Sequence, residues 1–180
     1  MNIVVPYVEG MLRPETREAL EGAATLVEIG RSSTAYWRLF CDLWSEGERF
    51  MIVEQDVVPT DEQLGRLEFC PYDWCVFPHW CGGSYAYGLG CVRFSAGLMR
   101  RHPDAMERIA QNDQLGVEPG YWPRMDSFVA MALSTAGARQ HHHHPPVVHL
   151  HEYELPPTPW RKYLRQTRTT RDWPAQQGEK

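Results

Sequence analysis

Two acids that follow a short apolar segment are the first residues with evident chemistry. Glu54 and Asp56 come directly after RFMIV at residues 49–53, a run typical of a buried parallel strand. Ligands of open α/β sheets bind beyond the carboxyl ends of such strands. Hard cations such as Mg²⁺ and Mn²⁺ prefer carboxylate oxygens and often share them with substrate phosphates. The acids therefore predict a cation site, and the alternative is a pair of surface acids in a turn.

Histidines late in the chain are further candidate ligands. His149 and His151 alternate within VVHLH at residues 147–151, so on a strand they point to one face. Neutral imidazole is a good ligand for Mn²⁺ or Zn²⁺. The alternative is two solvent-facing strand histidines. The run from His141 to His144 precedes two prolines, and we expect a loop in which these four residues are functionally inert.

Cysteines and glycines gather in the middle of the chain. Cys70, Cys75, Cys81 and Cys91 match no paired C-x2-C knuckle, so we expect buried free thiols rather than a zinc site. The segment WCGGSYAYGLG at residues 80–90 predicts a mobile or tightly turned loop, because glycine is the strongest local breaker of regular structure.

The elements that must position these residues follow an alternating order. Strands are predicted at residues 2–8, 25–29 and 49–53, with helices after Pro14 and at residues 35–46. This β-α-β-α-β order predicts a doubly wound α/β unit. Later predictions are a helix at 61–69, a strand at 74–77, a strand or turn at 91–95, two short helices around Pro103, a helix at 126–136 and a last strand at 147–151.

Composition agrees with one globular domain followed by a basic tail. The chain has 180 residues, 43% of them hydrophobic and 23% charged, and no apolar run approaches the 18 residues of a membrane span. The amino-terminal segment lacks the features of a secretory signal, so a cytoplasmic protein is expected. We place the packed domain at 1–155 and a Pro-rich, then basic, tail at 156–180. Residues 158–180 carry six Lys/Arg against two acids, although the whole chain has a net charge of −5.

The stretch RFMIVEQDVVP at residues 49–59, together with the β-α-β-α-β order, resembles the glycosyltransferases of the GT-A fold. In that family a short acidic motif after the central strand holds a divalent cation against the diphosphate of a nucleotide sugar. The resemblance implies a Rossmann-like, single-domain α/β fold with a mostly parallel central sheet flanked by helices. It also implies Mn²⁺ or Mg²⁺ and a nucleotide-sugar donor, with a UDP-sugar as the first expectation.

The resemblance assigns roles to the residues named above. Asp56 would bind the metal directly, and Glu54 would lie near the ribose or reach the metal through water. His149 or His151 would be a further metal ligand. Tyr7, after the first strand, falls where the family places its base-binding residues, with an ordinary strand-end aromatic as the alternative.

Two further assignments concern the acceptor and the donor sugar. Asp126, at the start of the expected helix at 126–136, would remove the acceptor proton if the enzyme inverts, although aspartate is also a preferred N-cap. Gly82 and Gly83 would let the backbone approach the donor sugar closely, with a plain flexible connection as the alternative.

The acceptor and two other functions stay open. The basic tail makes a hydroxymethylated base in phage DNA one candidate acceptor. A metal-dependent nucleotidyltransferase uses a similar sheet, but it usually needs a Gly-rich basic loop where residues 9–13 offer one Gly and one Arg. A non-enzymatic metal-binding protein built on the His and Cys residues is the third possibility.

Overall fold

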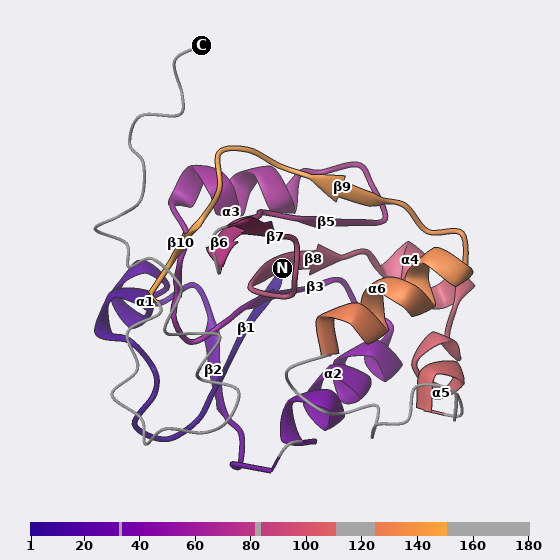
Figure 1. The fold of residues 1–180 in the computed structure, drawn as a ribbon, viewed down its shortest axis with the longest axis horizontal. Helices are drawn as coiled ribbons and strands as arrows, with labels where there is room; N and C mark the ends of the chain where they lie inside the picture. Colours follow the sequence, from indigo (N-terminus) through magenta and orange to yellow (C-terminus); the bar gives the residue numbers. More distant parts are fainter. Residues whose placement is uncertain (33, 82–83, 111–124, 151–180) are drawn as a thin grey trace.

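A six-stranded central sheet organises the chain (Figure 1). The computed structural model describes residues 1–32, 34–81, 84–110 and 125–150. Five strands run in one direction, and only β8 is antiparallel to its neighbours β3 and β5. The predicted α/β class with a mostly parallel sheet is therefore confirmed. Across the sheet the strands are β2 (Thr25–Glu28), β1 (Asn2–Tyr7), β3 (Phe50–Val53), β8 (Cys91–Phe94), β5 (Trp74–Val76) and β9 (Gln140–His142).

Helices cover both faces of the sheet (Figure 1). One face packs against α2 (Ala35–Glu46), α4 (Ala96–Arg101), α5 (Ala105–Ala110) and α6 (Met125–Thr135). The other face packs against α1 (Pro14–Ala19) and α3 (Asp61–Glu68). In the described part of the chain, no helix is both long enough and apolar enough to cross a membrane.

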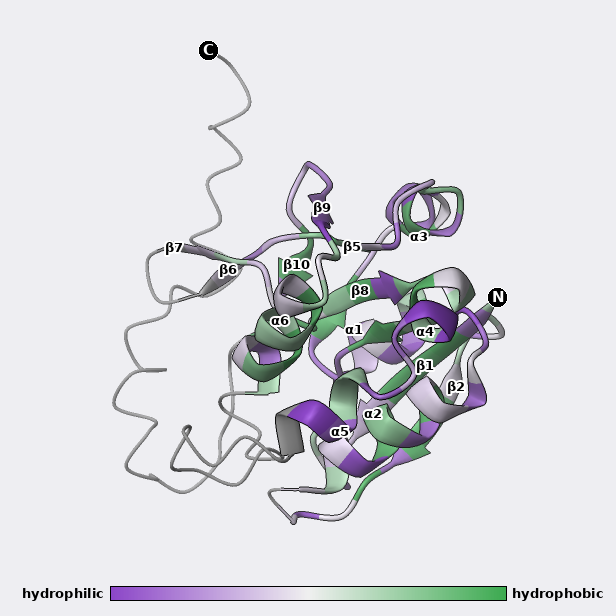
Figure 2. Ribbon diagram, turned by 90° about the vertical axis from the view of Figure 1, so that its right-hand side faces the viewer, coloured by the Kyte–Doolittle hydropathy of each residue, from purple (hydrophilic) through white to green (hydrophobic). Residues whose placement is uncertain are grey.

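Strand β3 explains why its sequence is a continuous apolar run. Successive side chains of a strand point to opposite faces. Phe50 and Ile52 therefore enter the core under α2, whereas Met51 and Val53 enter the core under α1 and α3. All four are at most 1% exposed. Figure 2 shows apolar colour along much of the central strands β1 and β8.

Local signals begin and end two of the predicted helices. Thr60 and Gln63 form a capping box at the start of α3, in which each side chain accepts a hydrogen bond from the other's backbone N–H. Gly47 ends α2 in the left-handed conformation, with φ of 69°, which favours glycine. Both helices lie within a residue of the predicted bounds.

The prediction of a loop at residues 80–90 was wrong in its first half. The chain forms a hairpin of β6 (His79–Cys81) and β7 (Ser84–Ala86), and Leu89 and Gly90 are buried. Trp80 pairs with Tyr85 across the hairpin, with ring centroids 5.0 Å apart. Cross-strand aromatic pairs stabilise hairpins, and this contact outweighed the glycine signal.

The prediction of a loop for the histidine run was wrong for His141 and His142, whereas His143 and His144 lie outside any strand or helix. Residues Gln140–His142 form β9, which pairs in parallel with β5 at the edge of the sheet. Polar side chains are tolerated there because an edge strand is covered on one side only. The last strand is shorter than predicted: β10 (Val148–His149) pairs with β4 (Val57–Val58) in a separate two-stranded sheet. Gly82, Gly83, His151 and the tail from residue 156 lie outside the described residues.

Candidate functional site

Asp56 and His149 lie in contact although 93 residues separate them in the chain. The Nε2 atom of His149 is 3.0 Å from Oδ2 of Asp56, and their side chains are 10% and 4% exposed. The pairing of β10 with β4 brings them together, because His149 is the register partner of Val57. The Leu150 N–H also donates to the Asp56 carbonyl at 2.7 Å. Asp56 and a late histidine are therefore close together, as expected. The strand that pairs with the histidine strand β10 is β4 rather than β3.

Glu54 joins this pair through a tight turn after β3. The Val57 N–H donates to the Glu54 carbonyl at 3.0 Å, and the Glu54 N–H donates to the Gly90 carbonyl at 2.9 Å. Glu54, Asp56 and His149 each offer one ligand atom, and these atoms lie within 4.8 Å of one another. The two predicted acids therefore face one site.

Gln55, the residue between the two acids, has a structural role that sequence reasoning missed. Its side chain is buried, and its Oε1 accepts a hydrogen bond from the Val8 N–H at 2.8 Å. The Gln55 carbonyl accepts from the Arg13 N–H at 2.9 Å. These bonds tie the acidic turn to the segment after β1, so the site is attached to two neighbouring strands.

Asp126 belongs to α6, which packs on the same face of the sheet as α2. Its Oδ1 accepts a hydrogen bond from the Leu89 N–H at 3.0 Å. Because α6 begins at Met125, Asp126 is the second helical residue rather than the N-cap, and the capping explanation is wrong. A Cβ added at Gly88 would lie 2.1 Å from Asp126 Oδ2, so glycine is required at position 88. The glycines of YGLG were the sequence signal for this close approach.

The carboxylates crowd one another. Burial, then Asp126 and then Asp56 raise the pKa of Glu54 well above its usual value, whereas the nearby Tyr36 hydroxyl lowers it. Burial raises the pKa of Asp126, and the Leu89 N–H and His149 oppose that shift. Glu54 is half-buried, whereas Asp126 is exposed to solvent. Like charges in a poorly solvated place destabilise the ionised forms, and a cation would offset that cost.

Two aromatic residues that the sequence did not single out complete the surroundings. Tyr36 of α2 is 1% exposed, and burial, followed by Glu54, raises the pKa of its hydroxyl. His79 of β6 packs edge-on against His149, with ring centroids 4.5 Å apart. A Cβ at Gly90 would lie 3.0 Å from His79 Nδ1, so this glycine too permits close packing. Helical periodicity alone marks Tyr36 as a core residue.

Tyr7 is placed apart from the carboxylate contacts described above. It ends β1, and its hydroxyl donates to Glu28 Oε2 on the parallel neighbour β2 at 3.4 Å. This is the carboxyl edge of the same sheet. The role of Tyr7 in binding a base stays a prediction, as do the roles of Gly82, Gly83 and His151, which lie outside the described residues.

The donor set fits a hard or borderline divalent cation. Carboxylate oxygens from Glu54 and Asp56 and a ring nitrogen from His149 suit Mn²⁺ well and Mg²⁺ through the carboxylates. These three residues would hold the ion, and Asp126 would face it from α6.

Comparisons with known proteins give fold likenesses only. No family model and no curated protein matches the chain. A putative glucose-1-phosphate thymidylyltransferase from Bacillus anthracis matches with TM-score 0.49 and 8% identity, over 82% of this chain and 87% of that one. A glycosyltransferase involved in glycosylation of the major capsid of PBCV-1 matches with TM-score 0.45 and 11% identity, over 81% and 83%. A CMP:2-keto-3-deoxy-manno-octonic acid synthetase matches with TM-score 0.46 and 9% identity, over 81% and 89%. At these scores and identities the likenesses do not place the chain in a family.

Proposed function

We propose that this protein transfers a sugar from a nucleotide-sugar donor to an acceptor hydroxyl, with Mn²⁺ or Mg²⁺ bound at Asp56. The observation that carries the proposal is the convergence of Asp56, Glu54 and His149 just beyond the carboxyl end of β3. Anionic ligands of open α/β sheets bind at such an edge. A UDP-sugar is the first donor to test.

Each residue has a distinct task in this proposal. When bound at Asp56 and His149, a divalent cation neutralises charge on the leaving diphosphate. Glu54 is a further ligand or a partner for the ribose. Asp126 is held through Oδ1 by the Leu89 N–H, and Oδ2 removes the proton of the acceptor hydroxyl. Its raised pKa brings the carboxylate closer to the pH at which a general base works best.

A donor screen tests the proposal. The full-length protein is incubated with UDP-, GDP- and CDP-sugars, with and without Mn²⁺, and released nucleoside diphosphate is measured with water as the default acceptor. We expect metal-dependent release from one donor, and loss of that release in Asp56→Asn. Asp42→Asn is the matched control, because Asp42 is an exposed residue of α2. Release that is independent of metal, or unchanged in Asp56→Asn, contradicts the proposal.

Nucleotidyl transfer is a second candidate, and the crowding of Glu54 with Asp126 favours it. In that reaction both carboxylates would hold metal, and neither would act as a base. The two reactions release different products. A sugar phosphate and a nucleoside triphosphate would yield pyrophosphate, whereas sugar transfer yields a nucleoside diphosphate. Pyrophosphate release that requires Asp126 would replace the first proposal.

The acceptor class is proposed from charge. Residues 158–180 carry six Lys/Arg, and cationic segments bind nucleic acid in a salt-dependent way. We propose hydroxymethylated DNA as the acceptor to test first. Deletion of 158–180 is expected to weaken DNA binding and to flatten its dependence on salt. Unchanged binding after the deletion removes this acceptor from consideration.

A further inference from the structure

A second group of metal-ligating side chains lies beside α3 and shares no residue with the candidate site. Cys70 follows α3 directly, and His141 and His143 lie on and just after the edge strand β9. Each residue offers one ligand atom, and the three atoms lie within 4.8 Å of one another. Cys70 is buried, and the two histidines are half-buried. The proposed transfer reaction uses none of them.

The spacing of one pair of atoms in this group is close to that of zinc ligands. Cys70 Sγ and His141 Nδ1 are 3.4 Å apart. In a tetrahedral site with Zn–S and Zn–N bonds of the usual lengths, sulfur and nitrogen lie about 3.6 Å from each other. This pair is therefore already at the separation that a shared ion requires.

Aromatic contacts hold both imidazole rings in place. Tyr72 stacks on His141 with ring centroids 4.2 Å apart, and Phe77 stacks on His143 at 5.0 Å. The two imidazoles themselves meet edge to face at 4.5 Å. In the described part of the chain, His143 Nε2 is buried without a hydrogen-bond partner. A buried polar atom left in that state is costly, and a ring that binds an ion offsets such a cost.

Two polar side chains contact Cys70. The Arg93 guanidinium donates to the Cys70 carbonyl. The Cys75 side chain hydrogen-bonds to that of Cys70. A sulfur and nitrogen donor set selects Zn²⁺ over Mg²⁺, in contrast to the oxygen-rich set around Asp56.

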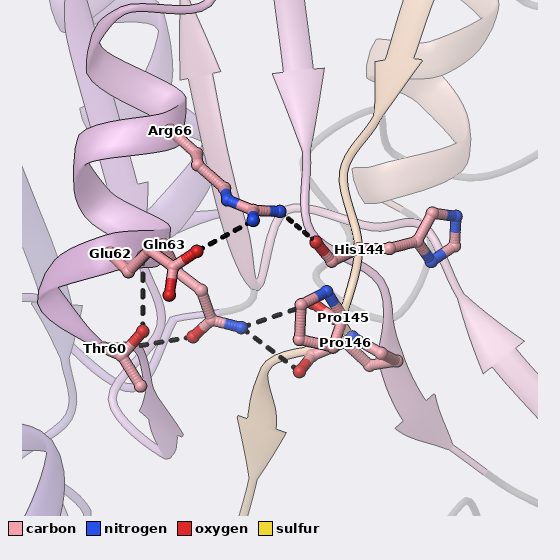
Figure 3. A network of polar contacts seen from close by, with 7 residues as sticks. All are labelled: Thr60, Glu62, Gln63, Arg66, His144, Pro145 and Pro146. Carbon is pink, nitrogen blue, oxygen red and sulfur yellow. Dashed lines mark hydrogen bonds and ion pairs between the residues drawn. The ribbon is translucent and has the colours of Figure 1, made fainter. Parts of the chain in front are cut away.

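We propose that Cys70, His141 and His143 supply three ligands of a zinc site that ties β9 to the end of α3. The chain between β9 and β10 is already attached to the same helix (Figure 3). The Gln63 amide donates to the carbonyls of Pro145 and Pro146 at 3.3 and 3.2 Å, and Arg66 donates to the carbonyl of His144. Because this segment leads directly to His149, the zinc ion would fix the strand that delivers the histidine of the candidate site.

Cobalt binding tests the proposal. The full-length protein without an affinity tag is stripped of metal and titrated with Co²⁺, in an Asp56→Asn background that disables the first site. We expect one equivalent to bind with a thiolate-to-cobalt charge-transfer band, and Zn²⁺ to displace it. Cys70→Ser should abolish the band and weaken Zn²⁺ binding by more than the roughly 10–100-fold that loss of an outer-shell partner costs. His143→Gln should weaken binding similarly while the thiol is kept.

Two control variants separate a built site from chance binding. Cys41→Ser changes a half-buried free thiol of α2, outside the cluster. His142→Gln changes the intervening histidine, which is exposed, lies against Gln140 and stacks on Tyr87. Both controls should bind cobalt like the parent. A parent without a thiolate band, a band that survives Cys70→Ser, or an equal loss in His142→Gln overturns the proposal, because each points to binding by the histidine run alone or to no site.

Discussion

Gly88 and Asp126 are packed so closely that a Cβ at position 88 would lie 2.1 Å from the Asp126 carboxylate. Only glycine, whose side chain is a single hydrogen atom, leaves enough room for the Asp126 carboxylate. The neighbouring Leu89 N–H binds the other oxygen of the same carboxylate. The turn at residues 88–89 thus fixes the orientation of Asp126, and a substitution in this turn should act through Asp126.

Gly88→Ala tests that dependence. The added methyl group must displace Asp126, and a misplacement of about 1 Å can reduce turnover by roughly 100-fold. We expect a loss of that order in the rate of nucleoside diphosphate release, with metal binding retained, measured by steady-state kinetics and Mn²⁺ titration. Gly65→Ala is the control, because a Cβ at this α3 residue meets nothing within 4 Å. Full turnover in Gly88→Ala would argue against a role for Asp126.

Glu54→Gln should stabilise the metal-free protein at neutral pH. Burial, Asp126 and Asp56 raise the folded-state pKa of Glu54 above its unfolded value of about 4.3. The folded state then binds more protons than the unfolded state, so the free energy of unfolding falls as the pH rises through that window. Glu54→Gln has no carboxylate to destabilise the folded state. Its gain in free energy of unfolding over the wild type should vanish below about pH 4, because Glu54 is then protonated in both states.

Urea unfolding in the presence of a chelator, at pH 4 and at pH 8, measures this effect. Glu48→Gln changes an exposed acid outside the site and should show no gain at either pH. Glu54→Gln should also weaken Mn²⁺ binding, since it removes an anionic oxygen ligand. If Glu54→Gln is no more stable than the wild type at pH 8, the ionised Glu54 carboxylate does not destabilise the folded state.

His149→Gln should weaken cation binding without unfolding the protein. The imidazole contacts Asp56 at 3.0 Å and supplies the nitrogen of the proposed ligand set. We expect Mn²⁺ affinity to fall by at least about 10-fold, measured by calorimetry, and Mg²⁺ affinity to fall less, because Mg²⁺ prefers oxygen. His144→Gln, at an exposed position, is the control. Equal affinities in the two variants would remove His149 from the site.

Gln55→Met should destabilise the fold and loosen the acidic turn. The substitution leaves the Val8 N–H without its side-chain acceptor, and an unsatisfied buried donor costs about 1–3 kcal/mol. Chemical denaturation measures the loss. Gln140→Met removes an exposed bond to the Tyr87 carbonyl and should cost less. Similar losses in both variants would mean that Gln55 does not anchor the turn.

Some elements could be predicted from the sequence because their signals are local. The apolar run at residues 49–53 marks a strand buried on both faces, and the capping pair of Thr60 and Gln63 marks the start of α3. The same is true of Glu54 and Asp56, which come at the carboxyl end of a predicted strand. Cys70, Cys75 and Cys91 are buried and form no disulfide.

Other elements depended on partners that are distant in sequence. The hairpin of β6 and β7 and the edge strand β9 form in segments rich in glycine or histidine, because a neighbouring strand supplies the missing hydrogen bonds and ring contacts. Local propensity cannot reveal such pairings.

The alternating α/β order and the acidic turn after the central strand could be predicted from the amino-acid sequence, since strand alternation and turn position are local properties of the chain. Which residues meet that turn depends on how the elements pack together. Asp56 contacts His149 because two short strands pair, and Asp126 reaches the same region through the space that Gly88 leaves. Such contacts arise from the packing of whole elements, in which backbone pairing and side-chain volume, rather than residue spacing, determine the distances.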